Sequence, residues 1–147
     1  MKRFLASGFG VGLFWKTYFG DKKGGGTLAS FLFALITYVF NLNVLELSIL
    51  FIVLVLTYLV SVDDKSWITL DEIVGMSLVT IASPSRLLPL LAGFLVFRLS
   101  DIMKQPKFVA ELEKHPGKLG VLYDDLGAGL MGLLSATVVN QIINLTL

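Results

Sequence analysis

The sequence contains no cysteine and only one histidine, His115. The absence of cysteine excludes thiol catalysis, disulfide bonds, thiolate zinc sites and iron–sulfur clusters. One histidine cannot build a multi-histidine metal site within a single chain. A strong net charge is also missing, because 12 Lys and Arg stand against 11 Asp and Glu. The sequence therefore lacks the basic surface of a nucleic-acid-binding protein, and we expect no nucleic-acid partner.

Charged residues are scarce altogether. They make up 16% of the 147 residues and hydrophobic residues make up 55%, whereas about 25% charged residues is usual for a soluble domain. This composition predicts a membrane protein, and the length predicts one domain over residues 1–147. The long apolar runs predict an all-α, polytopic protein with short transmembrane helices. These runs cover residues 27–42, 44–62, 73–97 and 126–147, with a tight turn at 41–43.

The third apolar run is interrupted by Ser83, Pro84, Ser85, Arg86 and Pro89, a cluster that ends one helix and starts another. Each arm on either side of the break is shorter than a full membrane crossing. We therefore expect a re-entrant helical hairpin over residues 71–97.

Basic residues gather on the cytoplasmic side of membrane proteins. If that rule fixes the orientation, most of the basic residues face the cytoplasm of a bacterial inner membrane, and any site beside them lies at that face. These residues are Lys2, Arg3, Lys16, Lys22, Lys23, Lys65, Arg98, Lys104, Lys107, Lys114 and Lys118.

Seven acidic residues cluster at the predicted cytoplasmic ends of the apolar segments. Ionisable groups at membrane depth are costly and are candidates for function. The alternative is that Asp71, Glu72, Asp124 and Asp125 are helix caps or first-turn residues that the helix dipole favours. The seven are Asp63, Asp64, Asp71, Glu72, Asp101, Asp124 and Asp125.

Arg98, Asp101 and Lys104 recur at every third residue, so on a helix they share one face. This spacing fits a surface ion-pair ladder. It also fits a site in which Asp101 joins the Asp71–Glu72 and Asp124–Asp125 pairs around a divalent metal, while Arg98 and Lys104 hold a phosphate. Hard carboxylate ligands and phosphate oxygens are typical of Mg²⁺.

Glycine and other small residues form three further groups. Gly8, Gly10 and Gly12 predict a tight turn. The segment 22–27, with three glycines before Thr27, leads into the first long helix and is either an anion-binding helix start or a linker with Thr27 as N-cap. Small residues at 128, 132 and 136 predict a face on the last helix where another helix packs closely.

These motifs, in their order, resemble those of the phosphatidylglycerophosphatase A family of bacterial membrane lipid phosphatases. The matching segments are Ser7-Gly8-Phe9-Gly10-Val11-Gly12, Gly26-Thr27-Leu28-Ala29-Ser30, Asp64 with Asp71-Glu72-Ile73-Val74-Gly75, Phe97-Arg98-Leu99-Ser100-Asp101-Ile102-Met103-Lys104, and Gly120-Val121-Leu122-Tyr123-Asp124-Asp125-Leu126-Gly127-Ala128-Gly129. Gly25, Ala29 and Gln105 stand where the family usually has Pro, Gly and Pro.

The resemblance implies an all-helical enzyme that uses Mg²⁺ to remove the terminal phosphate of phosphatidylglycerophosphate and so gives phosphatidylglycerol. The alternatives are a small ion- or proton-coupled transporter with acids at helix ends, and an inactive membrane scaffold. The sequence leaves the oligomeric state open. The implied catalytic residues are Asp71, Glu72, Asp101, Asp124 and Asp125. The implied metal ligands are these five and Asp64, and the implied phosphate-binding residues are Arg98, Lys104, Gly26, Thr27 and Ser30.

Overall fold

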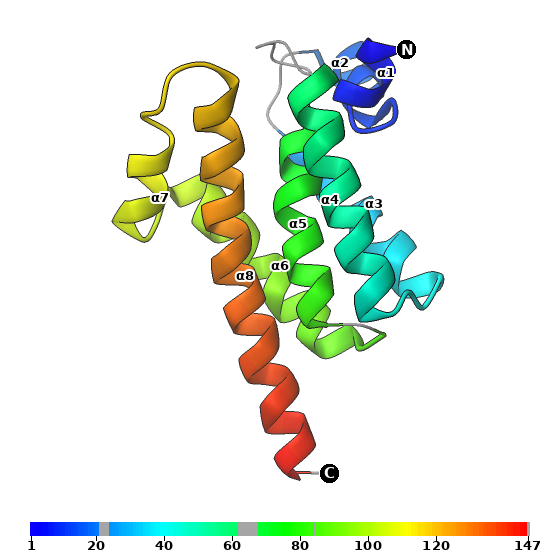
Figure 1. Cartoon of the computed structure of the whole chain (residues 1–147), viewed down its shortest axis with the longest axis vertical. Helices are drawn as coiled ribbons and strands as arrows, with labels where there is room; N and C mark the ends of the chain where they lie inside the picture. The colour runs from blue at the N-terminus through cyan, green and yellow to red at the C-terminus, as the bar shows by residue number, and fades with distance from the viewer. Residues whose placement is uncertain (21–23, 62–67, 84, 147) are drawn as a thin grey trace.

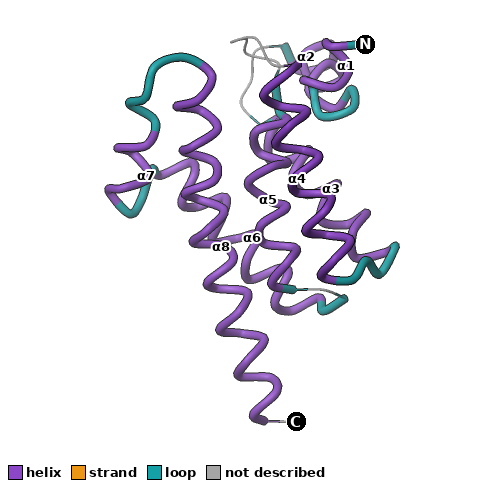
Figure 2. The backbone as a smooth tube through the Cα atoms, in the orientation of Figure 1, coloured by secondary structure: helices purple, strands orange, loops and turns teal. Residues whose placement is uncertain are grey.

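The computed structural model describes residues 1–20, 24–61, 68–83 and 85–146 of the chain. Within these ranges every regular element is a helix, which confirms the all-α prediction (Figures 1 and 2). The helices are α1 (Lys2–Ala6), α2 (Val11–Phe19), α3 (Gly25–Val39), α4 (Val44–Ser61), α5 (Leu70–Ala82), α6 (Leu87–Met103), α7 (Lys107–Leu112) and α8 (Lys118–Thr146).

The predicted turn at 41–43 joins α3 to α4. Asn43 and Glu46 form a reciprocal capping box, in which the Glu46 N–H donates to Asn43 Oδ1 at 3.0 Å and the Asn43 N–H donates to Glu46 Oε2 at 2.9 Å. Both side chains thereby satisfy backbone amides that the first turn of α4 leaves open. The turn is confirmed, and Glu46 has a local structural function at the start of α4.

The hairpin predicted from the break at residues 83–89 is formed by α5 and α6. Pro89 lies in the first turn of α6, where a missing N–H removes no helical hydrogen bond. α6 continues past Phe97 to Met103, so Arg98 and Asp101 lie on the helix that continues out of the third apolar run, as predicted. Ion pairs of Asp101 with Arg98 and Lys104 stabilise this last part of the helix. The position of this hairpin in a membrane stays a prediction.

The last helix starts much earlier than its apolar run. α8 begins at Lys118, whereas the uncharged run begins at Leu126. Asp124 and Asp125 therefore lie inside α8 and are buried, so the interpretation of these two residues as helix caps is wrong. A helix can carry acids in its second turn when neighbouring helices supply partners for them.

Helix α8 packs along both α5 and α6, and α5 also packs against α3 and α4. Two glycine pairs set the closest approaches in this core. A Cβ atom at Gly129 would lie 2.5 Å from the backbone oxygen of Gly75 on α5, and one at Gly132 would lie 2.7 Å from that of Gly93 on α6. The predicted small-residue face of α8 is confirmed, because Gly132 approaches the α6 backbone and Ala128 and Ala136 of the same face are fully buried.

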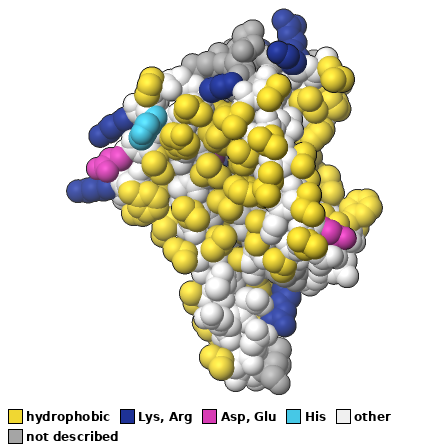
Figure 3. Space-filling model, in the orientation of Figure 1, with side chains coloured by type: hydrophobic (Ala, Val, Ile, Leu, Met, Phe, Trp, Pro, Cys, Tyr) yellow, Lys and Arg dark blue, Asp and Glu magenta, His cyan; other side chains and the backbone are white. Residues whose placement is uncertain are grey.

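The outside of the molecule is unusually apolar. Figure 3 shows hydrophobic side chains over much of one face, with charged side chains mainly at its upper and left margins. Within the described ranges, α4 with 18 residues and α8 with 29 are long and apolar enough to cross a membrane, by length and composition. The C-terminal part of α8 projects beyond the other helices (Figure 1).

Candidate active site

The predicted site residues of α5, α6 and α8 meet at one end of the hairpin. α6 returns antiparallel to α5, so the start of α5 and the end of α6 lie at the same end of the core. The beginning of α8 lies there as well, because α8 runs back along α6. This topology brings together Asp71 and Glu72 of α5, Arg98, Asp101 and Lys104 at the end of α6, and Asp124 and Asp125 of α8.

Asp101 is held between two cations, as the three-residue spacing predicted. Its Oδ2 lies 2.9 Å from Arg98 Nη1 and its Oδ1 lies 3.3 Å from Lys104 Nζ. The Lys104 ammonium also donates to Asp124 Oδ2 on α8. These pairs are therefore more than a ladder along the surface of one helix, because Lys104 joins α6 to α8 and Arg98 is only 9% exposed.

The charge of Lys104 is stabilised by these contacts. Burial alone would lower the pKa of the Lys104 ammonium group, but the hydrogen bond to Asp124 and the charges of Asp101 and Asp124 outweigh it, and the pKa is raised above 10.5. Lys104 is therefore protonated at neutral pH and holds a full positive charge between two carboxylates.

The remaining acids share one electrostatic environment. The Asp125 carboxyl group interacts with the charges of Asp71, Asp101, Asp124 and Arg98. Asp71, Asp124 and Asp125 are each at most 6% exposed. Several carboxylates so close together repel one another unless cations or protons compensate them.

Several buried polar atoms of this cluster have no hydrogen-bond partner. An unsatisfied buried polar group costs about 1–3 kcal/mol, and more when it is charged. Both hydrogen-bond acceptors and a hydrogen-bond donor of the cluster are open, that is, without a partner. The acceptors can therefore bind a cation while the donor binds an anion. The open acceptors are Asp71 Oδ1, Glu72 Oε2, Asp124 Oδ1 and Asp125 Oδ1, and the open donor is Arg98 Nε. Arg98 Nη1 makes no hydrogen bond either, but it is engaged in the ion pair with Asp101.

A metal ion fits the chemistry of these donors. Across the described ranges, no three Asp, Glu or His side chains lie close enough together to form a ready metal cage. Mg²⁺ needs no such cage, since it keeps several waters and binds through one or two carboxylates plus phosphate oxygens. The open carboxylate oxygens suit that mode of binding. Asp64, the sixth predicted ligand, lies outside the described residues.

The start of α3 reaches the same cluster. Glu72 packs against Gly26 so closely that a Cβ atom at Gly26 would lie 1.7 Å from Glu72 Oε1. The N-cap of α3 is Gly24, so the interpretation of Thr27 as N-cap is wrong. The Ser30 hydroxyl donates to the Gly26 backbone oxygen at 2.8 Å inside its own helix. Gly26 thus borders the acids, whereas the Ser30 hydroxyl is occupied locally.

Thr69 is a neighbour of the site that the sequence did not single out. It is buried at the N-cap of α5, directly before the two acids of that helix, and its N–H donates to the Ala6 backbone oxygen at 3.2 Å. The predicted turn at residues 7–12 packs here, because a Cβ atom at Gly8 would lie 2.6 Å from Thr69 Oγ1. A threonine two residues before an acidic pair was the available signal for this helix start.

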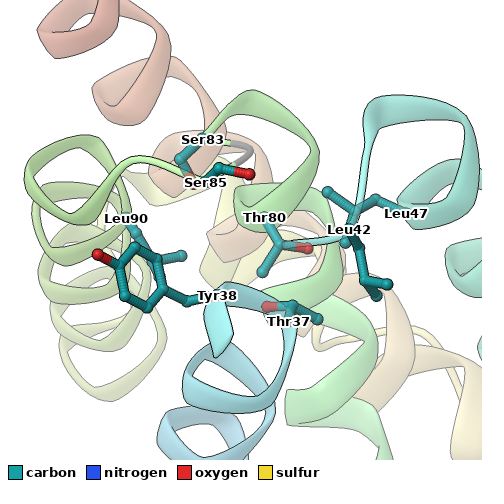
Figure 4. A pocket seen from close by; sticks show the side chains of 8 residues that line it. All are labelled: Thr37, Tyr38, Leu42, Leu47, Thr80, Ser83, Ser85 and Leu90. Carbon is teal, nitrogen blue, oxygen red and sulfur yellow. The ribbon is translucent and has the colours of Figure 1, made fainter. Parts of the chain in front are cut away.

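A small pocket lies at the opposite end of α5 and α6, between the α3–α4 turn and the α5–α6 turn (Figure 4). Its lining contains hydroxyl and apolar side chains and no charged one, so it offers neither metal ligands nor a phosphate-binding cation. The lining residues are Thr37, Tyr38, Leu42, Leu47, Thr80, Ser83, Ser85 and Leu90.

Comparison with known proteins places the chain in a family. No solved structure matches it. A protein of Bacteroides thetaiotaomicron named "Putative phosphatidylinositol-3-phosphatase" is 32% identical over 84 residues, which are 55% of this chain and 52% of the relative. The chain thus spans about half the length of this curated relative. The family model described as Phosphatidylglycerophosphatase A matches residues 4–140, nearly the whole chain, and the chain belongs to that family.

Proposed function

We propose that this protein is a Mg²⁺-dependent lipid phosphatase that hydrolyses the terminal phosphate monoester of phosphatidylglycerophosphate, releasing phosphatidylglycerol and inorganic phosphate. Family membership supports the reaction class. The observation that carries the proposal is the combination of the open buried Nε donor of Arg98 with open buried carboxylate oxygens on α5 and α8. A phosphate and a divalent cation together would satisfy both sets.

In the proposed reaction, Arg98 and Lys104 bind the phosphate. The Nε group of Arg98 provides a fixed N–H donor, and fixed donors stabilise charge that develops on a transferring phosphoryl group. Asp101 holds the guanidinium group in place through Nη1. The ammonium group of Lys104 adds a second positive charge at the more exposed edge of the cluster. The two cations would orient the phosphorus atom toward the acids of α5 and α8.

The acids divide between two tasks. Asp71, Glu72, Asp101, Asp124 and Asp125 supply the metal ligands and one general base, with Asp64 as a further ligand. When bound, Mg²⁺ would neutralise phosphate oxygens and lower the pKa of a bound water. The general base accepts a proton from the attacking water, whose oxygen forms the new bond to phosphorus. The bond from phosphorus to the lipid oxygen breaks, and that oxygen takes up a proton.

A lipid head group would enter from the Lys104 edge. The Lys104 side chain is 31% exposed, whereas that of Asp124 is 4% exposed. Leu99 and Ile102 are exposed on α6 beside this edge, so acyl chains can follow the outer face of α6 while the phosphate reaches Arg98. We place the protein as a multi-pass protein in the bacterial inner membrane with the site at the cytoplasmic face, in agreement with the basic residues around it.

A transporter is less compatible with this arrangement. Proton relays in transporters use acids in the middle of spans, whereas Asp71 and Asp101 lie in the first and last turns of their helices. The named activity of the Bacteroides relative suggests phosphatidylinositol 3-phosphate as a second lipid substrate to compare.

The test measures inorganic phosphate released by the full-length protein in a non-ionic detergent. Phosphatidylglycerophosphate, phosphatidylinositol 3-phosphate and glycerol 3-phosphate are compared with Mg²⁺ and with EDTA. We expect Mg²⁺-dependent release that is fastest with phosphatidylglycerophosphate. Equal rates in EDTA would contradict the metal requirement. Faster release from either of the other substrates would contradict the assigned substrate, and no release from any of them would contradict phosphatase activity.

A further inference from the structure

The position of the Lys104 ammonium group is unexpected for a residue whose only task is to bind phosphate. It lies between Asp101 of α6 and Asp124 of α8 and donates to both carboxylates. The Lys104 backbone has φ +51°, a left-handed conformation, at the C-cap of α6. A non-glycine residue is uncommon in this conformation. It ends α6 at the residue whose side chain reaches both acids.

Asp101 and Asp124 are both assigned as metal ligands in the proposed function. The Lys104 ammonium and a divalent cation would therefore share the same two carboxyl groups, and their positive charges would repel each other there. Asp101 Oδ1 contacts Lys104, and Asp101 Oδ2 contacts Arg98. Asp124 Oδ2 accepts a hydrogen bond from Lys104, whereas Asp124 Oδ1 has no hydrogen-bond partner. Metal coordination by Asp101 Oδ1 or Asp124 Oδ2 requires the ammonium group to withdraw.

Lys104 also has a place to withdraw to. Its side chain is 31% exposed and is the most exposed of the charged groups in its ion pairs. A lysine side chain is a flexible four-carbon stem with a point charge at its end. It can move toward the exposed edge, where the phosphate of a substrate would enter, without any movement of the helices.

We infer that Lys104 is a built-in counter-ion that occupies the Asp101 and Asp124 carboxylates when no divalent cation is bound, and that a divalent cation displaces it. This inference rests on the proposed function for the identity of the ligands. The ammonium group keeps the two acidic helices together in the metal-free protein. When a divalent metal ion binds these carboxylates, the displaced ammonium group of Lys104 becomes available to bind the substrate phosphate.

The first test measures Mn²⁺ affinity by electron paramagnetic resonance of free Mn²⁺, using full-length protein in non-ionic detergent without substrate. Lys104→Met removes both the competing charge and its repulsion of the metal, so the Kd for Mn²⁺ should fall by about tenfold or more. Lys104→Arg keeps the charge and should stay within about threefold of the unchanged protein. Lys107→Met is the matched control, since it removes an equal but exposed charge that salt screens.

The second test uses the unchanged protein and so does not depend on a variant that folds. An amine-reactive reagent labels lysines with and without saturating Mn²⁺, and mass spectrometry quantifies each site. Labelling of Lys104 should rise severalfold with Mn²⁺, because the displaced amine is no longer enclosed by the Asp101 and Asp124 carboxylates and is reached more easily by the reagent. Labelling of Lys107, the internal control, should not change.

The inference is overturned if Lys104→Met binds Mn²⁺ no more tightly than the unchanged protein, if Lys107→Met tightens binding equally, or if Lys104 labelling is indifferent to Mn²⁺. These outcomes are separable from failure of the proposed function. Mg²⁺-dependent phosphate release with unchanged Mn²⁺ affinity would refute the counter-ion and keep the phosphatase. Tighter Mn²⁺ binding in Lys104→Met, together with no phosphate release by the unchanged protein, would refute the phosphatase and keep the counter-ion.

Discussion

The contact between Gly129 of α8 and Gly75 of α5 fixes the distance between two helices that carry site acids. In Gly129→Ala, the new Cβ atom would lie 2.5 Å from the Gly75 backbone oxygen and 3.1 Å from the Gly75 Cα atom. A backbone cannot rotate out of the way, so α5 and α8 must move apart by several tenths of an ångström. Asp71 and Glu72 would then shift relative to Asp124 and Asp125.

Gly127→Ala is the matched control for this change. It lies two residues away on the same helix, and its Cβ atom would meet Leu112 Cδ1 at 2.7 Å and Phe108 Cε2 at 3.3 Å. Both contacts are the ends of side chains on α7, which can turn aside. Each substitution gains about 1 kcal/mol of helix propensity, and this gain cancels when the two variants are compared.

Overpacking of a tight core costs about 1–3 kcal/mol, so Gly129→Ala should be less stable than Gly127→Ala by about that amount in thermal or denaturant unfolding. Because a displacement of about 1 Å can reduce catalysis roughly 100-fold, phosphate release by Gly129→Ala should fall by about 10- to 100-fold. Gly127→Ala should stay within about twofold of the unchanged protein. Equal stability and activity in the two variants would refute the reasoning that this contact sets the geometry of the site.

Three further predictions concern single side chains. Asp124→Asn and Asp101→Asn should each lower phosphate release at least about 100-fold while membrane insertion persists, and near-normal turnover in either would remove that residue from the site. Arg98→Lys keeps the charge but loses the guanidinium fork, so kcat/KM should fall at least about tenfold; an unchanged value would show that charge alone suffices. Arg86 Nη1 donates to Asn140 Oδ1 and Asn144 Oδ1, each at 2.6 Å. Asn140→Ala and Asn144→Ala should therefore each lower the free energy of unfolding by about 1 kcal/mol and leave activity unchanged. A loss of activity without a loss of stability would contradict this purely structural function.

Much of the fold could be predicted from the sequence because its causes are local. Long apolar runs between polar breaks specify helices, and the Asn41–Asn43 turn and the break before Pro89 lie where the sequence placed them. The three-residue spacing of Arg98, Asp101 and Lys104 predicted a shared face in the same way. The wrong prediction of a helix boundary also has a local cause. The apolar run predicts too late a start for α8, because such a run marks the part of a helix that faces lipid or core and not the whole helix.

The sequence by itself therefore determined the helices, their apolar character and the set of acidic and basic residues that belong to one family. Only the tertiary structure decided how these residues meet. Gly75 and Gly129 let α5 and α8 touch through their backbones, and this contact lies between segments more than 50 residues apart. The bridge from Lys104 to Asp124 depends on the packing of α6 against α8, which Gly93 and Gly132 allow, since the two residues belong to different segments. No periodicity along the chain encodes such a contact, because it depends on how closely the helices approach in space.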